Sequence, residues 1–163
     1  MSIISKLATK ITEIAGKEIG VEELDGSNCG PRVDEYKAAT HLPPHEAWPW
    51  CAAFVCWCVR EAMKDGEYTF KRPTTAGAFA FENWSLAQDN STQTKKPTRG
   101  DIQPGDIVIF KFSHIGIATS VPTAGKIRTI EGNTNSAGER EGQGVFLKSR
   151  KVSSIRSRIR FTV

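Results

Sequence analysis

The sequence predicts an α+β domain, with helices in the N-terminal half and an antiparallel sheet in the C-terminal half. Apolar residues recur at helical spacing near the N-terminus, and short β-branched runs dominate the chain after residue 105. The two kinds of segment do not alternate. Helices followed by strands are typical of helices packed on an antiparallel sheet.

Four helices are expected. The first is indicated by apolar residues at helical spacing, namely Ile3, Ile4, Leu7, Ile11, Ile14 and Ala15. Pro31 opens a short second helix that continues through Lys37. After the loop "THLPPHEAWPW", residues 51–64 form a third helix, closed by Gly66 just past its end. A fourth covers about 75–87.

Five strands are expected to follow as an antiparallel meander. They are "GDIVIF", "HIGIATSV", "KIRTIEGNT", "GVFLKSR" and "SRIRFTV". The polar segments "DNSTQTKKPTRGD" and "TNSAGEREGQG" are expected to be loops.

The length of 163 residues predicts a single domain, residues 1–163, which we expect to be monomeric. No apolar run is long enough to span a membrane, so we expect no membrane insertion. The N-terminus lacks the apolar block and cleavage site of a signal peptide, which predicts synthesis in the cytoplasm.

The net charge of +4 is mild, and its excess lies near the C-terminus. The basic residues there are Lys148, Arg150, Lys151, Arg156, Arg158 and Arg160. They are typical either of a face that attracts an anionic polymer or of a solvated strand edge.

The stretch "AWPWCAAFVCWC" places Cys51 at or next to the first position of the third helix. Helix N–H groups and the positive end of the helix dipole favour a thiolate there and can receive an oxyanion. The alternative is that the thiol only fills space in the core. Cys56 and Cys58, later in the same helix, suit that second interpretation.

A thiolate nucleophile needs a base and a group that orients the base. His114 begins a predicted strand, where it can lean over a helix N-terminus, whereas His41 and His45 lie in a Pro-rich loop. Glu131 and Asn133 are two residues apart on the next strand and so share one face. A purely structural role for His114 is the alternative.

These blocks resemble a known family. "WPWCAAFVCW", "GDIVIFKFSHIGIATSV" and "IEGNT" are similar to the signature blocks of CHAP-domain peptidoglycan amidohydrolases, within the papain-like group that includes the NlpC/P60 enzymes. "EIGVEELDGSNCGPRVDEYKAAT" is similar to the segment that precedes the cysteine block in such domains. The resemblance covers roughly residues 10–135.

The resemblance implies a papain-like CHAP fold and a cysteine hydrolase that acts on bacterial peptidoglycan. It implies Cys51 as nucleophile, His114 as general base, Glu131 as the orienting acid and Asn133 as an assisting residue. The bond cut would be the muramoyl–L-alanine amide or a peptide bond in the stem or bridge.

Substrate-binding candidates surround the thiol. Trp48 and Trp50 are expected either as walls of a groove or as core residues. The resemblance places Asn28 and Tyr36 near the active cleft, although Tyr36 also suits helix packing.

No cofactor is expected. The loop before Cys51 has no Asp and one Glu, so we predict no calcium site. The cysteines and histidines lack a paired C-x2-C knuckle, which disfavours zinc, and four cysteines do not make a disulfide scaffold.

A basic nucleic-acid-binding module is the alternative from a different class, but the tryptophans lie away from the basic residues, so we expect no nucleic-acid partner. Two biological settings remain open. One is a phage endolysin released through a holin, and the other is a secreted interbacterial effector whose producer would keep an immunity protein. In both, the enzyme would act on periplasmic or cell-wall peptidoglycan.

Overall fold

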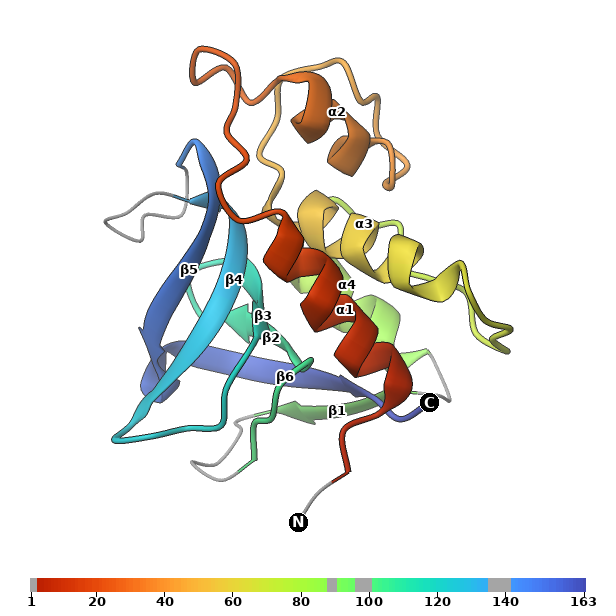
Figure 1. The fold of residues 1–163 in the computed structure, drawn as a ribbon, viewed down its shortest axis with the longest axis vertical. Helices are drawn as coiled ribbons and strands as arrows, with labels where there is room; N and C mark the ends of the chain where they lie inside the picture. Colours follow the sequence, from red (N-terminus) through yellow and green to blue (C-terminus); the bar gives the residue numbers. More distant parts are fainter. Residues whose placement is uncertain (1–2, 88–90, 96–100, 135–141) are drawn as a thin grey trace.

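The computed structural model describes residues 3–87, 91–95, 101–134 and 142–163. Within these ranges the helices come first in the chain: α1 (Lys6–Lys17), α2 (Pro31–Lys37), α3 (Cys51–Met63) and α4 (Ala78–Leu86). The remaining elements are β1 (Ser91–Lys95), β2 (Ile107–Phe110), β3 (His114–Ala118), β4 (Lys126–Thr134), β5 (Gly144–Lys151), a 3-10 turn (Val152–Ser154) and β6 (Ile155–Phe161). Figure 1 shows the helices gathered on one side of a curved sheet. The predicted α+β fold is confirmed.

The helix starts follow local sequence signals. The Ser5 hydroxyl caps α1 by accepting a 3.1 Å hydrogen bond from the Ala8 amide, and Pro31 occupies the first turn of α2. Helix α3 begins at Cys51, as predicted. Helix α4 begins at Ala78, three residues later than about 75.

The described strands form one antiparallel sheet in the order β1-β6-β2-β3-β4-β5. Strands β2 to β5 form the predicted meander. The prediction was wrong for β6, which returns across the sheet to pair with β2 instead of extending the meander beside β5. It was also wrong for Ser91–Lys95, predicted as loop, which pairs with β6 as the edge strand β1. An exposed strand edge pairs through its backbone, so a polar segment without a strand pattern can fill it.

The rest of the first predicted loop, 88–90 and 96–100, lies outside the described residues, as does most of the second, 135–141. No helix in the described part of the chain is both long and apolar enough to cross a membrane.

The middle strands β2 and β3 are buried on both faces. Side chains alternate along a strand, so β2 directs Ile107 and Ile109 toward the core shared with α1 and α3, and Val108 and Phe110 toward the other face. A smaller apolar cluster covers that second face. Its members are Ile102, Val108, Phe110, Ala118, Ile127, Val152 and Ile155. Burial on both faces explains why "IVIF" is continuously apolar.

Candidate active site

Cys51 is the first residue of α3 and is only 5% exposed. No side chain caps this helix end, so the positive end of the helix dipole lies beside the sulfur. The following residues Phe54 and Val55 are fully buried and hold the helix rigidly in the core. The position keeps the thiol in one place beside the unpaired N–H groups of the first helical turn.

His114 is the first residue of β3 and is fully buried. Its ring lies nearly parallel to those of Phe110 and Phe112, with centroid distances of 5.9 and 5.8 Å. Nε2 of His114 lies 2.8 Å from Oε1 of Glu131. The Cys51 sulfur lies close enough to the imidazole to raise its pKa, and the buried Nδ1 makes no hydrogen bond to the described residues.

Two glycines make room for the carboxylate. A Cβ on Gly116 would lie 2.7 Å from Cγ of Glu131, so the Glu131 side chain occupies the space that a side chain at position 116 would fill. A Cβ on Gly132 would lie 2.8 Å from Phe54 and Trp50 of the α3 region. The glycines in "HIG" and "EGN" therefore let β3, β4 and α3 approach closely enough to assemble the site.

The electrostatics of the pair follow from burial and contact. Burial opposes a charged imidazole, but the nearby Cys51 sulfur and the hydrogen bond to Glu131 outweigh it and raise the pKa of His114 to about 9. Burial likewise opposes a charged Glu131, but hydrogen bonds from Arg150 and His114 lower its pKa to about 2. Near neutral pH the site therefore holds an imidazolium and a carboxylate.

Glu131 has further donors that sequence reasoning missed. The Thr129 hydroxyl donates to Oε2 at 2.5 Å, and Nε of Arg150 donates to the same oxygen at 2.8 Å. Nη2 of Arg150 donates to Oε1, the oxygen that His114 contacts. Arg150 lies on β5 and was grouped only with the basic C-terminal residues, because no sequence spacing indicates a contact between β5 and the "EGN" block.

Asn133 is fully buried and has a positive φ of 57°. The pairing of β4 with β5 shifts register between Glu131 and Thr134. This bulge interrupts the alternation from which the sequence predicted that Glu131 and Asn133 share one face. Glu131 contacts His114, and the assisting role of Asn133 stays a prediction.

Two of the predicted substrate-binding residues belong to the core. Trp50 and Tyr36 are fully buried and stack with a centroid distance of 5.6 Å. The Trp50 indole donates to Glu23, and the Tyr36 hydroxyl donates to Glu18, both at 2.7 Å. This packing is the alternative that the sequence left open for both residues. Direct contact with substrate stays a prediction.

Trp48 and Asn28 are only partly buried. The Trp48 indole donates to the Pro43 carbonyl, and the fully buried Lys37 lies over its ring at 5.5 Å. Lys37 also donates to the backbone carbonyls of Asn28 and Glu46. Lys37 thereby connects the loop of Asn28 to the loop that precedes α3. Trp48 and Asn28 both stay candidates for contact with substrate.

The remaining cysteines and histidines are engaged elsewhere. All four cysteines are free, and burial raises the pKa of Cys56 to about 12, with its thiol donating to the Thr75 carbonyl. His41 contacts the Thr74 carbonyl, and the exposed His45 contacts Asp34. No group of metal-binding side chains occurs among the residues that the structure describes.

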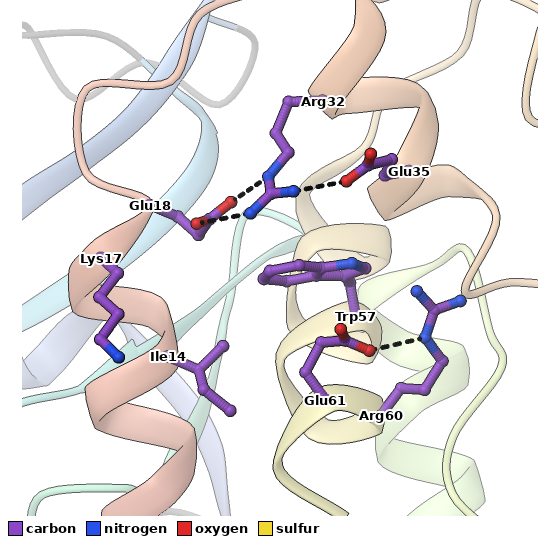
Figure 2. Close-up of a pocket in the computed structure, with 8 residues that line it drawn as sticks. All are labelled: Ile14, Lys17, Glu18, Arg32, Glu35, Trp57, Arg60 and Glu61. Carbon is purple, nitrogen blue, oxygen red and sulfur yellow. Dashed lines mark hydrogen bonds and ion pairs between the residues drawn. The ribbon is translucent and has the colours of Figure 1, made fainter. Parts of the chain in front are cut away.

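A separate hollow lies between α1, α2 and α3, and its lining residues are shown in Figure 2. Its volume is about 290 Å³. Its floor is the Trp57 ring, with the Arg32 guanidinium 4.8 Å from the ring centroid. Arg32 bridges Glu18 and Glu35 across the opening. Trp57 follows Cys51 by six residues, about 9 Å along the helix axis, so this hollow is distinct from the thiol site.

The fold and the thiol–imidazole–carboxylate arrangement define a papain-like protein. The sequence matches the family model of the CHAP domain over residues 43–133, more than half of the chain, and the chain therefore belongs to the CHAP family. That span contains Cys51, His114 and Glu131 and ends at Asn133.

No curated protein matches the sequence. Among solved structures, the fold is similar to that of the wild-type endolysin LysIME-EF1, with a TM-score of 0.58 and 15% sequence identity. The similarity covers 98% of this chain and 65% of the endolysin chain, so this chain corresponds to less than two thirds of that protein.

Proposed function

We propose that this protein is a cysteine peptidoglycan hydrolase in which Cys51 is the nucleophile, His114 the general acid and base, and Glu131 the orienting acid. Membership in the CHAP family supports the class of peptidoglycan hydrolase. The observation that carries the residue assignment is the position of His114, which interacts with the Cys51 thiol and is bonded through Nε2 to Glu131.

In the proposed reaction, the Cys51 thiolate attacks the carbonyl carbon of an amide bond. Backbone N–H groups at the start of α3 stabilise the resulting oxyanion. The His114 imidazolium gives its proton to the leaving amine, and the C–N bond breaks to leave a thioester on Cys51. Neutral His114 then takes a proton from water, whose oxygen attacks the thioester and releases the acid.

Glu131 orients the His114 ring and stabilises its protonated form. A buried carboxylate on Nε2 keeps Nδ1 directed toward the thiol and stabilises the imidazolium that accompanies the thiolate. Asn133, in the bulge beside Glu131, is proposed to assist in orienting these groups. Trp48 and Asn28 are proposed to contact the substrate beside the thiol.

The bond cut is either the muramoyl–L-alanine amide or a peptide bond in the stem or bridge. The similarity to an endolysin fold favours a phage endolysin over a secreted effector with an immunity protein. A nucleic-acid-binding role receives no such support, because ion pairs occupy the arginines of β5 and β6 that would carry it.

The test is digestion of purified peptidoglycan by the wild type and by Cys51→Ala, followed by mass spectrometry of the fragments. We expect Cys51→Ala to lower turnover by a factor of about 1000 or more while its circular dichroism stays unchanged. Cys56→Ala is the matched control, because it removes a buried thiol of the same helix and should keep activity.

New lactyl-sugar ends and free L-alanine N-termini would identify an amidase, and cut stems or bridges an endopeptidase. Wild-type rates of lysis by folded Cys51→Ala would overturn the proposed function.

A further inference from the structure

Arg150 makes the most extensive contact with Glu131. Its guanidinium donates through Nε to Oε2 and through Nη2 to Oε1, a bidentate pairing that fixes the plane of the carboxylate. The Arg150 side chain is only 13% exposed, and Glu131 is fully buried. The ion pair is therefore shielded from solvent and from salt.

The same guanidinium lies over two aromatic rings. Its Cζ lies 5.3 Å from the centroid of Phe110 and 5.4 Å from that of Phe112. These rings also stack on His114. Arg150 and His114 thus share two neighbours, the aromatic pair and Oε1 of Glu131, although they come from strands β5 and β3.

The charges in this cluster alternate. In the form that the proposed reaction starts from, the charges of the Cys51 thiolate, the His114 imidazolium, the Glu131 carboxylate and the Arg150 guanidinium sum to zero. Without Arg150, the buried site would hold one unbalanced negative charge. Such a charge is costly in a region of low dielectric, and it would be relieved by holding the proton on His114 more tightly.

We propose that Arg150 is a positioning residue for the Cys51–His114–Glu131 site: it fixes the orientation of Glu131 and limits how strongly that carboxylate retains the proton on His114. This inference rests on the proposed function. The physical reason lies in the reaction, since His114 must release its proton to the leaving amine and then accept one from water. A carboxylate shared between two cations holds the imidazolium less firmly than one that His114 has to itself.

The titratable and charged groups around His114 and Glu131 come from two elements. Cys51 belongs to α3, while Arg150 belongs to β5. Lys148, two residues before Arg150, lies on the same face of β5 by strand alternation. Thr129 on β4 adds an uncharged donor. Substitution of Arg150 alone leaves the others in place.

The experiment compares the pH dependence of kcat/KM on peptidoglycan fragments for the wild type, Arg150→Gln and Arg150→Lys. Arg150→Gln should lower kcat/KM about 100-fold, because the orientation of Glu131 is lost. It should also move the pH at which activity falls on the alkaline side upward by about one unit, because a cation next to the imidazolium is lost. Arg150→Lys keeps the positive charge but loses the bidentate pairing of the guanidinium with Glu131. Its alkaline limb should stay near that of the wild type, with kcat/KM lowered about tenfold.

Arg160→Gln is the matched control. Arg160 makes a comparable pairing with the buried Asp106, at 2.9 Å from Nε and 2.7 Å from Nη2, away from His114. This control should lower the melting temperature without moving the pH profile.

A second measurement does not depend on turnover. NMR titration of His114 in Cys51→Ala and in Cys51→Ala/Arg150→Gln should give the higher His114 pKa in the double variant. An unchanged His114 pKa, or an alkaline limb that Arg150→Gln leaves in place, would overturn the role of Arg150. Activity retained by Cys51→Ala would instead overturn the proposed function, so the two failures are distinguishable.

Discussion

Gly116 shows how a single residue decides whether this site can form. The Glu131 side chain fills the volume above Gly116, and the carboxylate cannot withdraw because His114, Thr129 and Arg150 hold it. In the sequence, this glycine is one residue of the signature block "GDIVIFKFSHIGIATSV". Its physical reason required the neighbouring strand, because Glu131 is 15 residues further along the chain.

We expect Gly116→Ala to destabilise the fold by about 1–3 kcal/mol and to lower activity at least tenfold, because the new methyl displaces Glu131. Thermal unfolding and peptidoglycan digestion would measure the two effects. Gly16→Ala is the control, since a Cβ there meets nothing within 4 Å, and it should stabilise α1 by about 0.5–1 kcal/mol. Full activity in Gly116→Ala would contradict the close approach of Glu131.

At the scale of elements, α3 and the β2–β3 hairpin were predictable because their signals are local. The apolar run after Cys51 has helical length, and β-branched residues mark β2 and β3. The placement of β6 was not predictable, since its partner β2 lies about 50 residues earlier and its own pattern fits several neighbours equally well. The β4 bulge, which reorients Asn133, also has no distinct signal in "IEGNT".

Helix α4 is attached to β6 through Glu82. This carboxylate is nearly buried and accepts hydrogen bonds from Ser157 at 2.6 Å and from Arg156 at 3.1 Å. We expect Glu82→Ala to lower the free energy of unfolding by about 2 kcal/mol, because the buried Ser157 hydroxyl loses its acceptor and Arg156 loses its partner. Chemical denaturation would measure this loss, and kcat of the folded fraction should not change. If Glu82→Ala had wild-type stability, the hydrogen bonds of Glu82 would not contribute to holding α4 against β6.

At the scale of the whole molecule, four of the six basic C-terminal residues form ion pairs instead of a free cationic surface. Arg150, Arg156, Arg158 and Arg160 are paired with Glu131, Glu82, Asp101 and Asp106. Of the two interpretations of this basic cluster, the structure therefore gives little support to attraction of an anionic polymer. Those pairings join β5 and β6 to residues distant in sequence.

Binding to peptidoglycan should accordingly depend only weakly on salt. We expect the affinity of Cys51→Ala for insoluble peptidoglycan to fall less than about threefold between low and physiological salt, because the arginines of β5 and β6 are already paired with carboxylates. A sedimentation assay measures this directly. A steep decline with salt would show that unpaired charges, rather than shape and hydrogen bonding, govern attachment.

The stability of the molecule should also depend on the pH through the buried pair. His114 has a folded pKa of about 9 against an ordinary 6.5, so its contribution is complete below about 6.5 and is lost as the pH rises through 9. Glu131 has a folded pKa of about 2 against 4.5, so its contribution is complete above about 4.5 and is lost as the pH falls through 2. The contribution of the pair is therefore greatest between about pH 4.5 and 6.5.

Melting temperatures measured across the pH range would test this window, with His114→Ala as the comparison. The variant should lose the decline between about pH 6.5 and 9 that His114 causes in the wild type. An identical alkaline decline in both proteins would assign it to other groups.

The sequence by itself determined the helices, the meander β2–β5 and the three blocks that carry Cys51, His114 and Glu131, because local periodicity and short motifs encode them. Only the tertiary structure decided that Trp50 and Tyr36 are core residues, that β1 and β6 complete the sheet, and that Arg150 joins the Glu131 carboxylate. These features depend on contacts between strands and helices far apart in the chain. Such contacts are set by packing and by charge pairing in three dimensions, for which no spacing in the sequence gives a signal.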